Sequence, residues 1–232
     1  MISIHHLTNS RSQRVIWLLE ELGLKYNLII HERCAKTRQA AESLYQVHPL
    51  GKAPVLIDGD INLAESGAIF DYLVATYGKE ALAPAENSVE QINYFYWKNF
   101  SEASLMPYLA MSQVFTRITQ GTPFFFKPLI TLLFKKVNAK YLYKNLKIEL
   151  NMIEKHLGTH QHFTGDNFSA ADILMEFMLD ALANRFFSQT SHPHTSQYLL
   201  RIKQRPAYLR ALKNGNWSED EFNQYWLHLK NS

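Results

Sequence analysis

Three short segments in the first 70 residues carry side chains suited to binding a small charged molecule. The first, Asn9-Ser10-Arg11-Ser12-Gln13-Arg14, lies where a strand-like run gives way to a helical pattern. A helix N-terminus presents unpaired N–H groups and a partial positive charge, which stabilise an anion. A serine hydroxyl there can donate a hydrogen bond to a thiolate or an oxyanion. The segment also has a purely structural interpretation, because Ser10 and Gln13 fit a Ser-x-x-Gln capping box.

The second segment is His48-Pro49-Leu50-Gly51-Lys52-Ala53-Pro54-Val55. A proline that opens a strand has no N–H for the ladder, so it belongs at an edge or a turn. If the Ala53–Pro54 bond is cis, the Val55 backbone turns outward, where it can pair with a peptide-like ligand. A cis bond is the minority form, about 5–6% of X–Pro bonds in folded proteins. By itself this segment therefore predicts a turn, and a ligand only as the less frequent alternative.

The third segment, Ala64-Glu65-Ser66-Gly67-Ala68, lies between a predicted strand and a predicted helix. Ser66 is by default a helix N-cap. Its hydroxyl and the first N–H groups of the helix can instead bind a carboxylate, while Glu65 binds an ammonium and Lys52 a second carboxylate. Taken together, the three segments predict a site for a small zwitterionic peptide beside a helix start that carries a hydroxyl.

The hydrophobic pattern predicts the elements that position these segments. Apolar residues recur at helical spacing from Val15 to Leu22, and Gly23 ends that helix as a C-terminal cap. Because the helix is apolar on more than one face, we expect neighbours on two sides of it. Asp58-Gly59-Asp60 predicts a tight hairpin turn. The expected strands are 2–7, 26–30, 54–57 and 61–64, and the expected helices are 12–22, 38–46 and 66–77.

The rest of the chain contains almost no period-2 alternation and is expected to be helical. Residues 79–87 are a predicted linker, and Ser169 with Asp172 resembles a capping pair. We therefore predict an α/β domain of order βαβαββα over 1–80 and an all-α domain over 88–232. The expected helices are 88–118, 128–157, 169–187, 195–204, 206–213 and 218–229.

Composition excludes several classes of protein. The chain has 232 residues, 47% of them hydrophobic and 19% charged, so a disordered chain is excluded. One cysteine excludes an internal disulfide framework, and the histidines lack metal-site spacing, so no metal is expected. A net charge of +3 is too small to propose nucleic acid as a partner. The first residues have no apolar signal region, and we expect a soluble cytoplasmic protein.

The charge is unevenly distributed, at −1 over residues 1–80 and +4 over 81–232. The apolar run from Phe124 to Phe134 is too short to span a membrane and contains Lys127. The favoured interpretation of the lysines is a solvated helix face; the alternative is weak attraction to an anionic membrane surface. The lysines that precede Glu149 in this stretch are Lys127, Lys135, Lys136, Lys140, Lys144 and Lys147.

In combination, these segments resemble the cytosolic glutathione transferases. The resemblance covers nearly the whole chain and is most specific in SRSQRVIWLLEELGLKY (10–26) and PLGKAPVLIDGDINLAESGAIFDYL (49–73). A later segment, FTGDNFSAADILM (163–175), resembles the buried capping segment of that family. The resemblance implies a thioredoxin-like N-terminal domain and an all-helical domain that contributes the pocket for the second substrate.

The resemblance also implies roles for individual residues. Ser10 matches the catalytic serine of the serine-type classes, with Ser12 as the alternative donor, and Cys34 is expected to be incidental. Arg11 and Arg14 are expected mainly as solvated helix-face charges. The residues implied to bind glutathione are Lys52, Val55, Glu65 and Ser66, with Pro54 as the cis-proline. The candidates for the acceptor pocket are Thr8, Met111 and Phe115, with Met106 and Tyr108 as further possibilities.

The implied activity is conjugation of glutathione to electrophilic small molecules, typical of detoxification. An ordinary thiol, with a pKa of about 8.5, is only a few per cent thiolate at pH 7, and Ser10 is expected to stabilise the anion. Glutathione is the implied co-substrate and a homodimer the implied assembly. Two alternatives remain open: a non-catalytic binding or interaction protein of the same fold, and a glutathione-dependent peroxidase or lyase.

Overall fold

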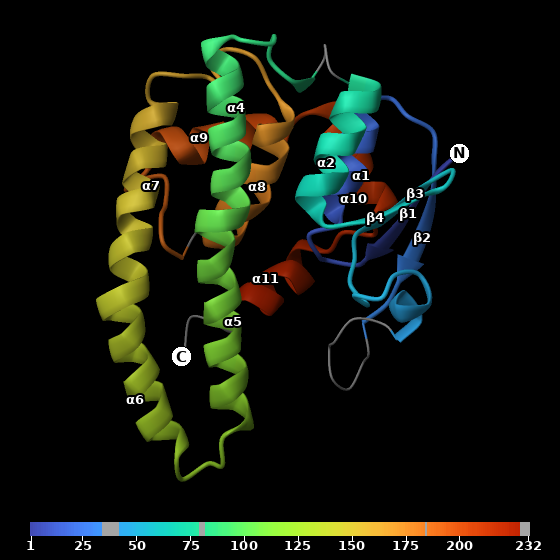
Figure 1. The fold of residues 1–232 in the computed structure, drawn as a ribbon. Helices are drawn as coiled ribbons and strands as arrows, with labels where there is room; N and C mark the ends of the chain where they lie inside the picture. The colour runs from blue at the N-terminus through green and yellow to red at the C-terminus, as the bar shows by residue number, and fades with distance from the viewer. Residues whose placement is uncertain (34–41, 79–81, 184, 228–232) are drawn as a thin grey trace.

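The computed structural model describes residues 1–33, 42–78, 82–183 and 185–227. In Figure 1 a four-stranded sheet with its helices stands beside a bundle of longer helices. The sheet has the order β2-β1-β3-β4, with β1 and β2 parallel and β3 antiparallel to both β1 and β4. The strands are β1 (Ile2–Leu7), β2 (Tyr26–His31), β3 (Val55–Asp58) and β4 (Ile61–Ala64).

Between β2 and β3 the chain forms a 3-10 turn over Glu42–Gln46. The start of the helix predicted over 38–46 lies outside the described residues, and so does Cys34. The predicted hairpin is confirmed, since Asp58 pairs with Ile61 across a turn in which Gly59 has a φ of +59°. That positive φ is the reason for glycine at the position. The hydroxyl of Tyr72, from the following helix, donates to Asp58 over 2.9 Å and fastens the turn to that helix.

Helix α1 (Gln13–Glu21) is the centre of the N-terminal half. It packs against β1 and α2 (Ser66–Leu73) on one side and against α8 (Ala170–Leu182) and α10 (Pro206–Asn214) on the other. The predicted cover on two sides is therefore confirmed. This cover explains why Ile16 and Leu18 are both completely buried although they point to opposite sides of the helix. Gly23 follows with a φ of +63°, as expected of a C-terminal cap.

The helical half is built around two long helical segments, each made of two consecutive helices. Helices α4 (Val89–Phe100) and α5 (Met106–Gly121) are joined through a wide π turn, and so are α6 (Lys127–Val137) and α7 (Tyr143–Leu157). The predictions of helix over 88–118 and 128–157 are thus confirmed. Helix α8 runs through the middle, with all but one of its residues buried. The fold class predicted from sequence, a thioredoxin-like domain followed by helices, is correct.

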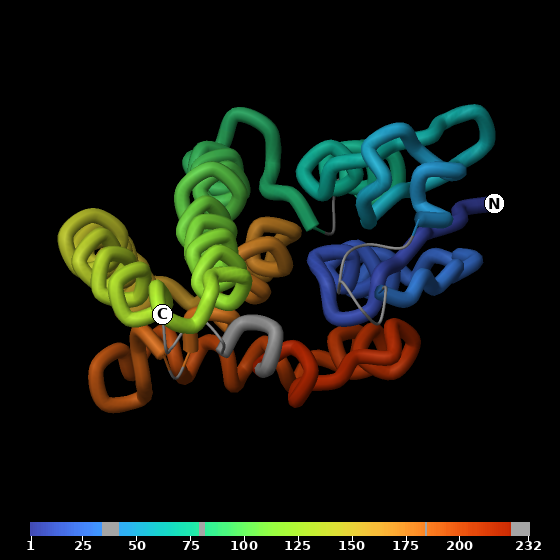
Figure 2. The backbone as a smooth tube through the Cα atoms, turned by 90° about the horizontal axis from the view of Figure 1, so that it is seen from below, coloured from blue at the N-terminus to red at the C-terminus, as the bar shows by residue number. Residues whose placement is uncertain are grey.

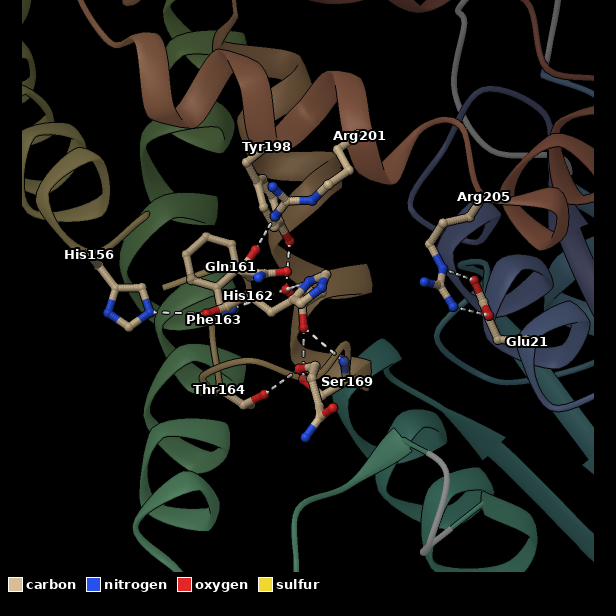
Figure 3. A network of polar contacts seen from close by, with 12 residues as sticks. Glu21, His156, Gln161, His162, Phe163, Thr164, Ser169, Tyr198, Arg201 and Arg205 are labelled. Atoms are coloured by element: carbon tan, nitrogen blue, oxygen red, sulfur yellow. Dashed lines mark hydrogen bonds and ion pairs between the residues drawn. The ribbon is translucent and has the colours of Figure 1, made fainter. Parts of the chain in front are cut away.

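The segment before α8 is fixed by Asp172, whose partners Phe163, Ser169 and Tyr198 are labelled in Figure 3. Its carboxylate accepts hydrogen bonds from the N–H groups of Phe163 and Ser169 and from the hydroxyl of Tyr198 on α9 (Pro193–Ile202). The capping box predicted for Ser169 and Asp172 is present. This cap joins the start of α8 to its neighbours and so holds the central helix in place.

The C-terminal helices turn back onto the sheet domain, which the sequence did not predict. Figure 2 shows the red segment lying along the blue one, and Arg205 forms a two-pronged ion pair with Glu21 of α1, at 2.6 and 2.8 Å. Arg210 binds Glu20 at 2.7 Å. The last described helix, α11 (Glu219–Leu227), follows α10. The C-terminal end of α1 is therefore tied to the last helices of the chain.

Candidate functional site

A cavity of about 290 Å³ lies between the turn after β1 and the first turns of α5. The sheet domain contributes Ser10, Arg11 and Lys52 to its lining, so two of the predicted segments meet there. The helical domain contributes Met106, Ala110, Gln113 and Phe177. The cavity thus has a polar wall from one domain and a mainly apolar wall from the other.

Ser10 lies half-buried on the polar wall, just before α1 begins. Its Oγ is 2.8 Å from Oγ of Ser12 and accepts the Ser12 N–H over 3.3 Å. Asn9, immediately before it, has a φ of +52°, which turns the chain sharply into the helix start. Asn9 in turn binds the C-terminal segment, accepting from the Ser218 N–H and donating to Glu221.

Behind Ser10 lies a chain of hydrogen bonds. His6 Nε2 is 2.9 Å from the carbonyl oxygen of Gly215, and His6 Nδ1 is 2.8 Å from Oγ of Ser12. A carbonyl only accepts, so Nε2 carries the proton and Nδ1 is the acceptor. Ser12 therefore donates to His6, and Ser10 donates to Ser12. Burial lowers the pKa of His6 to about 4, against the opposing effect of the Gly215 carbonyl, so the ring is neutral at pH 7.

This arrangement separates the two candidate serines. Ser12 is completely buried, and its Oγ also accepts the Leu7 N–H over 3.1 Å. Ser10 borders the cavity, whereas Ser12 is not among the residues that line it. Of these two serines, Ser10 is therefore the one with access to the cavity, and Ser12 connects it to the interior.

Arg14 differs from its expected role as a solvated charge. Its side chain is only 1% exposed, and Nη1 lies 2.5 Å from Oε1 of Glu102 in the turn between α4 and α5. Arg11 approaches the same carboxylate at 3.7 Å. Burial by itself raises the pKa of Glu102, but the charge and hydrogen bond of Arg14 outweigh it, so the pKa lies below its ordinary value. The pair joins the helix that follows Ser10 to the opposite wall of the cavity.

The Ser10–Gln13 capping box is also wrong. The N-cap residue of α1 is Ser12, and it makes no side-chain cap bond. The Gln13 amide instead donates to the carbonyl of Ala211 in α10 over 2.6 Å. The Gln13 side chain therefore forms a tertiary hydrogen bond to α10 in place of a local cap at the start of α1.

The sheet register brings the second segment to Ser10. His5 pairs with Val55, so the end of β1 runs alongside Pro54 and Ala53. The Ala53–Pro54 bond is cis, Val55 is buried, and the exposed Lys52 borders the cavity. Gly51 has a φ of +57°, and a Cβ there would come within 2.4 Å of the Tyr45 ring. Glycine is thus required for the turn that presents Lys52.

The third segment reaches the same edge through β4. Val55 pairs with Ala64, so Glu65 and Ser66 lie next to Pro54 at that end of the hairpin. Glu65 is exposed and has the unusual backbone angles φ +71° and ψ +121°, while Ser66 is buried at the first position of α2. Strained φ values of this kind cost free energy and cluster at ligand sites.

The acceptor-pocket candidates are placed differently from the sequence expectation. Thr8, Met111 and Phe115 are not among the lining residues of the cavity. Phe115 stacks on Phe134 of α6, with ring centroids 4.4 Å apart, and is therefore engaged in joining α5 to α6. The α5 residues that do line the cavity are Met106, Ala110 and Gln113. Their spacing of i, i+4 and i+7 places them on one face of the helix. Other faces of α5 also carry apolar residues at helical spacing, so the sequence alone did not identify the face that lines the cavity.

A second cavity, of about 630 Å³, lies between the chain after residue 81 and the segment that precedes α8. Its walls include the capping residue Ser169, and Arg205, whose guanidinium stacks on Phe168 and pairs with Glu21. These groups already form structural contacts with other parts of the fold. The larger volume of this cavity is therefore not sufficient to make it the candidate functional site. Across the described residues there is no cluster of three or more potential metal ligands, and no helix is long and apolar enough to cross a membrane.

Comparisons with known proteins agree with this geometry. Residues 2–75 match the model of the glutathione S-transferase N-terminal domain, and residues 125–211 match that of the C-terminal domain. The chain is 35% identical to glutathione S-transferase 3 of Schizosaccharomyces pombe, over 89% of this chain and 85% of that protein. It is 30% identical to glutathione S-transferase 1 of Saccharomyces cerevisiae, over 90% and 92% of the two chains.

Among solved structures, a glutathione S-transferase from Actinobacillus pleuropneumoniae superposes with a TM-score of 0.79. It is 32% identical and covers 99% of both chains. A sphingomonad glutathione S-transferase complexed with glutathione, at 23% identity and a TM-score of 0.67, shares the fold. With both domain models matched and relatives aligned over most of their length, the chain belongs to the glutathione S-transferase family and is an enzyme of that family.

Proposed function

We propose that this enzyme binds glutathione at the sheet edge, stabilises its thiolate through Ser10 and conjugates it to electrophilic small molecules. The observation that carries the proposal is the position of Ser10. Its hydroxyl stands at a helix start and borders a cavity whose opposite wall is lined by Met106, Ala110 and Phe177. A polar wall that activates sulfur and an apolar wall that accepts a carbon electrophile suit this reaction.

The binding of glutathione would use the second and third segments. Lys52 offers a cation for the glycyl carboxylate, and the Val55 backbone offers hydrogen bonds to the cysteinyl unit. Glu65 and Ser66 offer a carboxylate, a hydroxyl and the first N–H groups of α2 to the γ-glutamyl end. The register that places Pro54 beside Glu65 supports this assignment, because it brings all four groups to one edge of the sheet.

Ser10 acts as a hydrogen-bond donor. In the unliganded arrangement its proton points to Ser12, so it must turn toward the sulfur when thiolate forms. Ser12 then still donates to His6 and accepts from the Leu7 N–H, so no buried group is left unpaired. A neutral hydrogen bond is worth about 1 kcal/mol and one to an anion about 1.5–3 kcal/mol, which favours the exchange.

The energy required is moderate. Lowering a thiol pKa by two units takes roughly 2.7 kcal/mol of preferential stabilisation of the thiolate. One charge-assisted hydrogen bond together with a helix N-terminus supplies energy of that order. With an activated aryl chloride, the sulfur forms a bond to the ring carbon and chloride leaves. The thiol proton passes to solvent, so one proton and one chloride are released per conjugate.

We also propose a homodimer that works in the cytoplasm, where thiols are held reduced. Helix α4 supports the dimer, because it exposes apolar side chains at helical spacing toward solvent. Ile92 is 67% exposed, and its neighbours on this side are Val89, Phe95 and Tyr96. A contiguous apolar face of this kind on a folded chain is characteristic of a protein interface.

The test is a titration of glutathione into the purified protein, followed by the ultraviolet absorbance of the thiolate across pH. A bound thiol that ionises below its free pKa supports activation, and binding without a shift indicates a carrier. Ser66→Ala and Lys52→Ala should weaken glutathione binding and leave the thiol pKa of the saturated complex unchanged. Turnover of a hydroperoxide in place of the aryl chloride would favour the peroxidase alternative.

A further inference from the structure

The α5–α6 hairpin forms an exposed apolar tip. Figure 1 shows the two helices extending past the rest of the molecule, with their connecting loop at the free end. The loop residues Phe124, Phe125 and Phe126 are 74%, 69% and 59% exposed. Three adjacent exposed phenylalanines lose the favourable burial that such side chains normally contribute to folding. An exposed apolar cluster of this kind is a candidate contact surface.

The apolar surface continues along α6, in which no residue is buried. Its inner side packs on α5 through Phe134 and Phe115. Leu129 on the outer side is 65% exposed, and Leu132 and Leu133 are each 51% exposed. Because these positions are three and four residues apart, they form one stripe that faces away from α5. We call Phe124–Phe126 and this stripe the hairpin tip.

The hairpin and the chain that follows it into α7 are also strongly cationic. Residues 103–148 contain seven lysines and arginines and no acid, so this stretch carries +7 and the rest of the chain −4. Lys136 and Lys140 follow Leu129 at i+7 and i+11 and therefore continue the same stripe. At 1.5 Å per residue, Lys136 stands about 10 Å from Leu129 along the helix axis. Among the described residues, no lysine of residues 103–148 forms an ion pair with a carboxylate.

We propose that the hairpin tip docks on a bilayer surface that contains anionic lipid. The distance of about 10 Å from Leu129 to Lys136 along the helix axis is similar to the depth of about 5–10 Å to which interfacial helices bury their apolar face. The lysines that follow then lie level with the anionic headgroups. The charge disfavours a second copy of this chain as the occupant, since two surfaces that both carry excess positive charge would repel each other. No described helix spans a membrane, so the contact is peripheral.

The test is co-sedimentation of the full chain with vesicles. One set contains phosphatidylcholine alone, and the other contains phosphatidylcholine mixed with phosphatidylglycerol. We expect binding to the mixed vesicles, weakened by salt, and little binding to the neutral ones. Leu129→Ser should weaken binding about tenfold, the loss expected for one buried leucine. Its control is Leu200→Ser on α9, because Leu200 is 63% exposed and far from the tip in sequence.

The charge is tested by Lys136→Glu, which should weaken binding at least about tenfold because each basic residue near the surface contributes. Its control is Lys155→Glu at the far end of α7, which should bind as the original chain does. All four side chains are exposed or half-exposed at the surface, so thermal unfolding should stay unchanged. The proposal is overturned if mixed vesicles bind no protein at low salt, or if tip and control variants bind equally. It is also overturned if the tip variants change the oligomeric state without lipid.

Discussion

His6 Nδ1 lies 2.8 Å from Oγ of Ser12, and this contact sets the direction of the hydrogen bond made by Ser10. The other ring nitrogen of His6 is committed to the carbonyl of Gly215, at 2.9 Å. The tautomer is therefore fixed by a residue that lies beyond α10, more than 200 positions along the chain. The hydroxyl proposed to meet sulfur is thus oriented by the C-terminal segment, which links folding of the last helices to chemistry at the first turn.

The two serines should respond differently to removal of their hydroxyls. Ser10→Ala should lower turnover with an aryl chloride by roughly 10–100-fold, because one charge-assisted hydrogen bond to the thiolate is lost. Glutathione affinity should change little, because the proposed binding contacts are made by other residues. The unfolding midpoint should also change little, because Ser10 borders a cavity and is not part of the packed core. Steady-state kinetics and thermal denaturation of the same preparation measure both quantities.

Ser12→Ala should act mainly on stability. It leaves the Leu7 N–H and His6 Nδ1 without their partner in the interior, which costs about 1–3 kcal/mol per group. The free energy of unfolding, measured with urea, should fall accordingly. If instead Ser12→Ala abolished turnover in a stable protein while Ser10→Ala was fully active, the assignment of the donor to Ser10 would be wrong.

Acid should destabilise the fold through His6. Burial lowers its folded-state pKa to about 4, whereas in the unfolded chain it takes a proton near pH 6.5. Between these values the unfolded state binds more protons, so stability is lost as the pH falls through this window. The loss amounts to about 3 kcal/mol for this group. Urea unfolding at a series of pH values should show it.

His6→Gln provides the comparison for that prediction. The glutamine amide can still donate to the Gly215 carbonyl but does not titrate, so the fall in stability between pH 6.5 and 4 should become shallower. Burial also lowers the pKa values of His5 and His31, and part of the slope should therefore remain. An unchanged slope in His6→Gln would assign the acid sensitivity to those residues instead.

Alkali should destabilise the fold through Glu176 on α8. Its side chain is buried, and burial together with the nearby Asp180 raises its pKa to about 8 despite the opposing charges of Lys203 and Arg14. The folded state keeps this proton where the unfolded chain has lost it, so stability falls as the pH rises from about 4.5 to 8. Glu176→Gln should therefore be more stable than the original chain at pH 9 and similar to it at pH 5. The exposed Glu90→Gln is the control and should show no such crossover in thermal denaturation.

The sequence predicted those parts of the molecule whose signals are local. The period of apolar residues located every strand and most helix ends, and Gly23 and Gly59 have the positive φ values that their turns require. The capping pair of Ser169 and Asp172 was predictable for the same reason, because its partners are three residues apart. Local chemistry of this kind needs no knowledge of the tertiary fold.

Contacts between distant residues could not be predicted in this way. Gln13 fitted a local cap, but its amide binds Ala211, and Arg14 resembled a surface charge although it is buried against Glu102. Both errors have one cause, the packing of α10 and of the α4–α5 turn against α1. The lining residues of α5 were mispredicted for a similar reason. Met106 and Met111 are equally apolar, and only the position of the turn after β1 determines that Met106 lines the cavity.

The proposed dimer can be tested at α4. Ile92→Glu introduces a charge at a side chain that is 67% exposed in the single chain but would be buried in the dimer. An unpaired buried carboxylate is costly, so the variant should be a monomer by sedimentation equilibrium at concentrations where the original chain is a dimer. Leu209→Glu on α10, 55% exposed, should remain a dimer. Because Ser10 and Lys52 are far from Ile92 in sequence and face a cavity within one chain, the monomer should still bind glutathione. A dimer that survives Ile92→Glu would place the interface on a different face of the molecule.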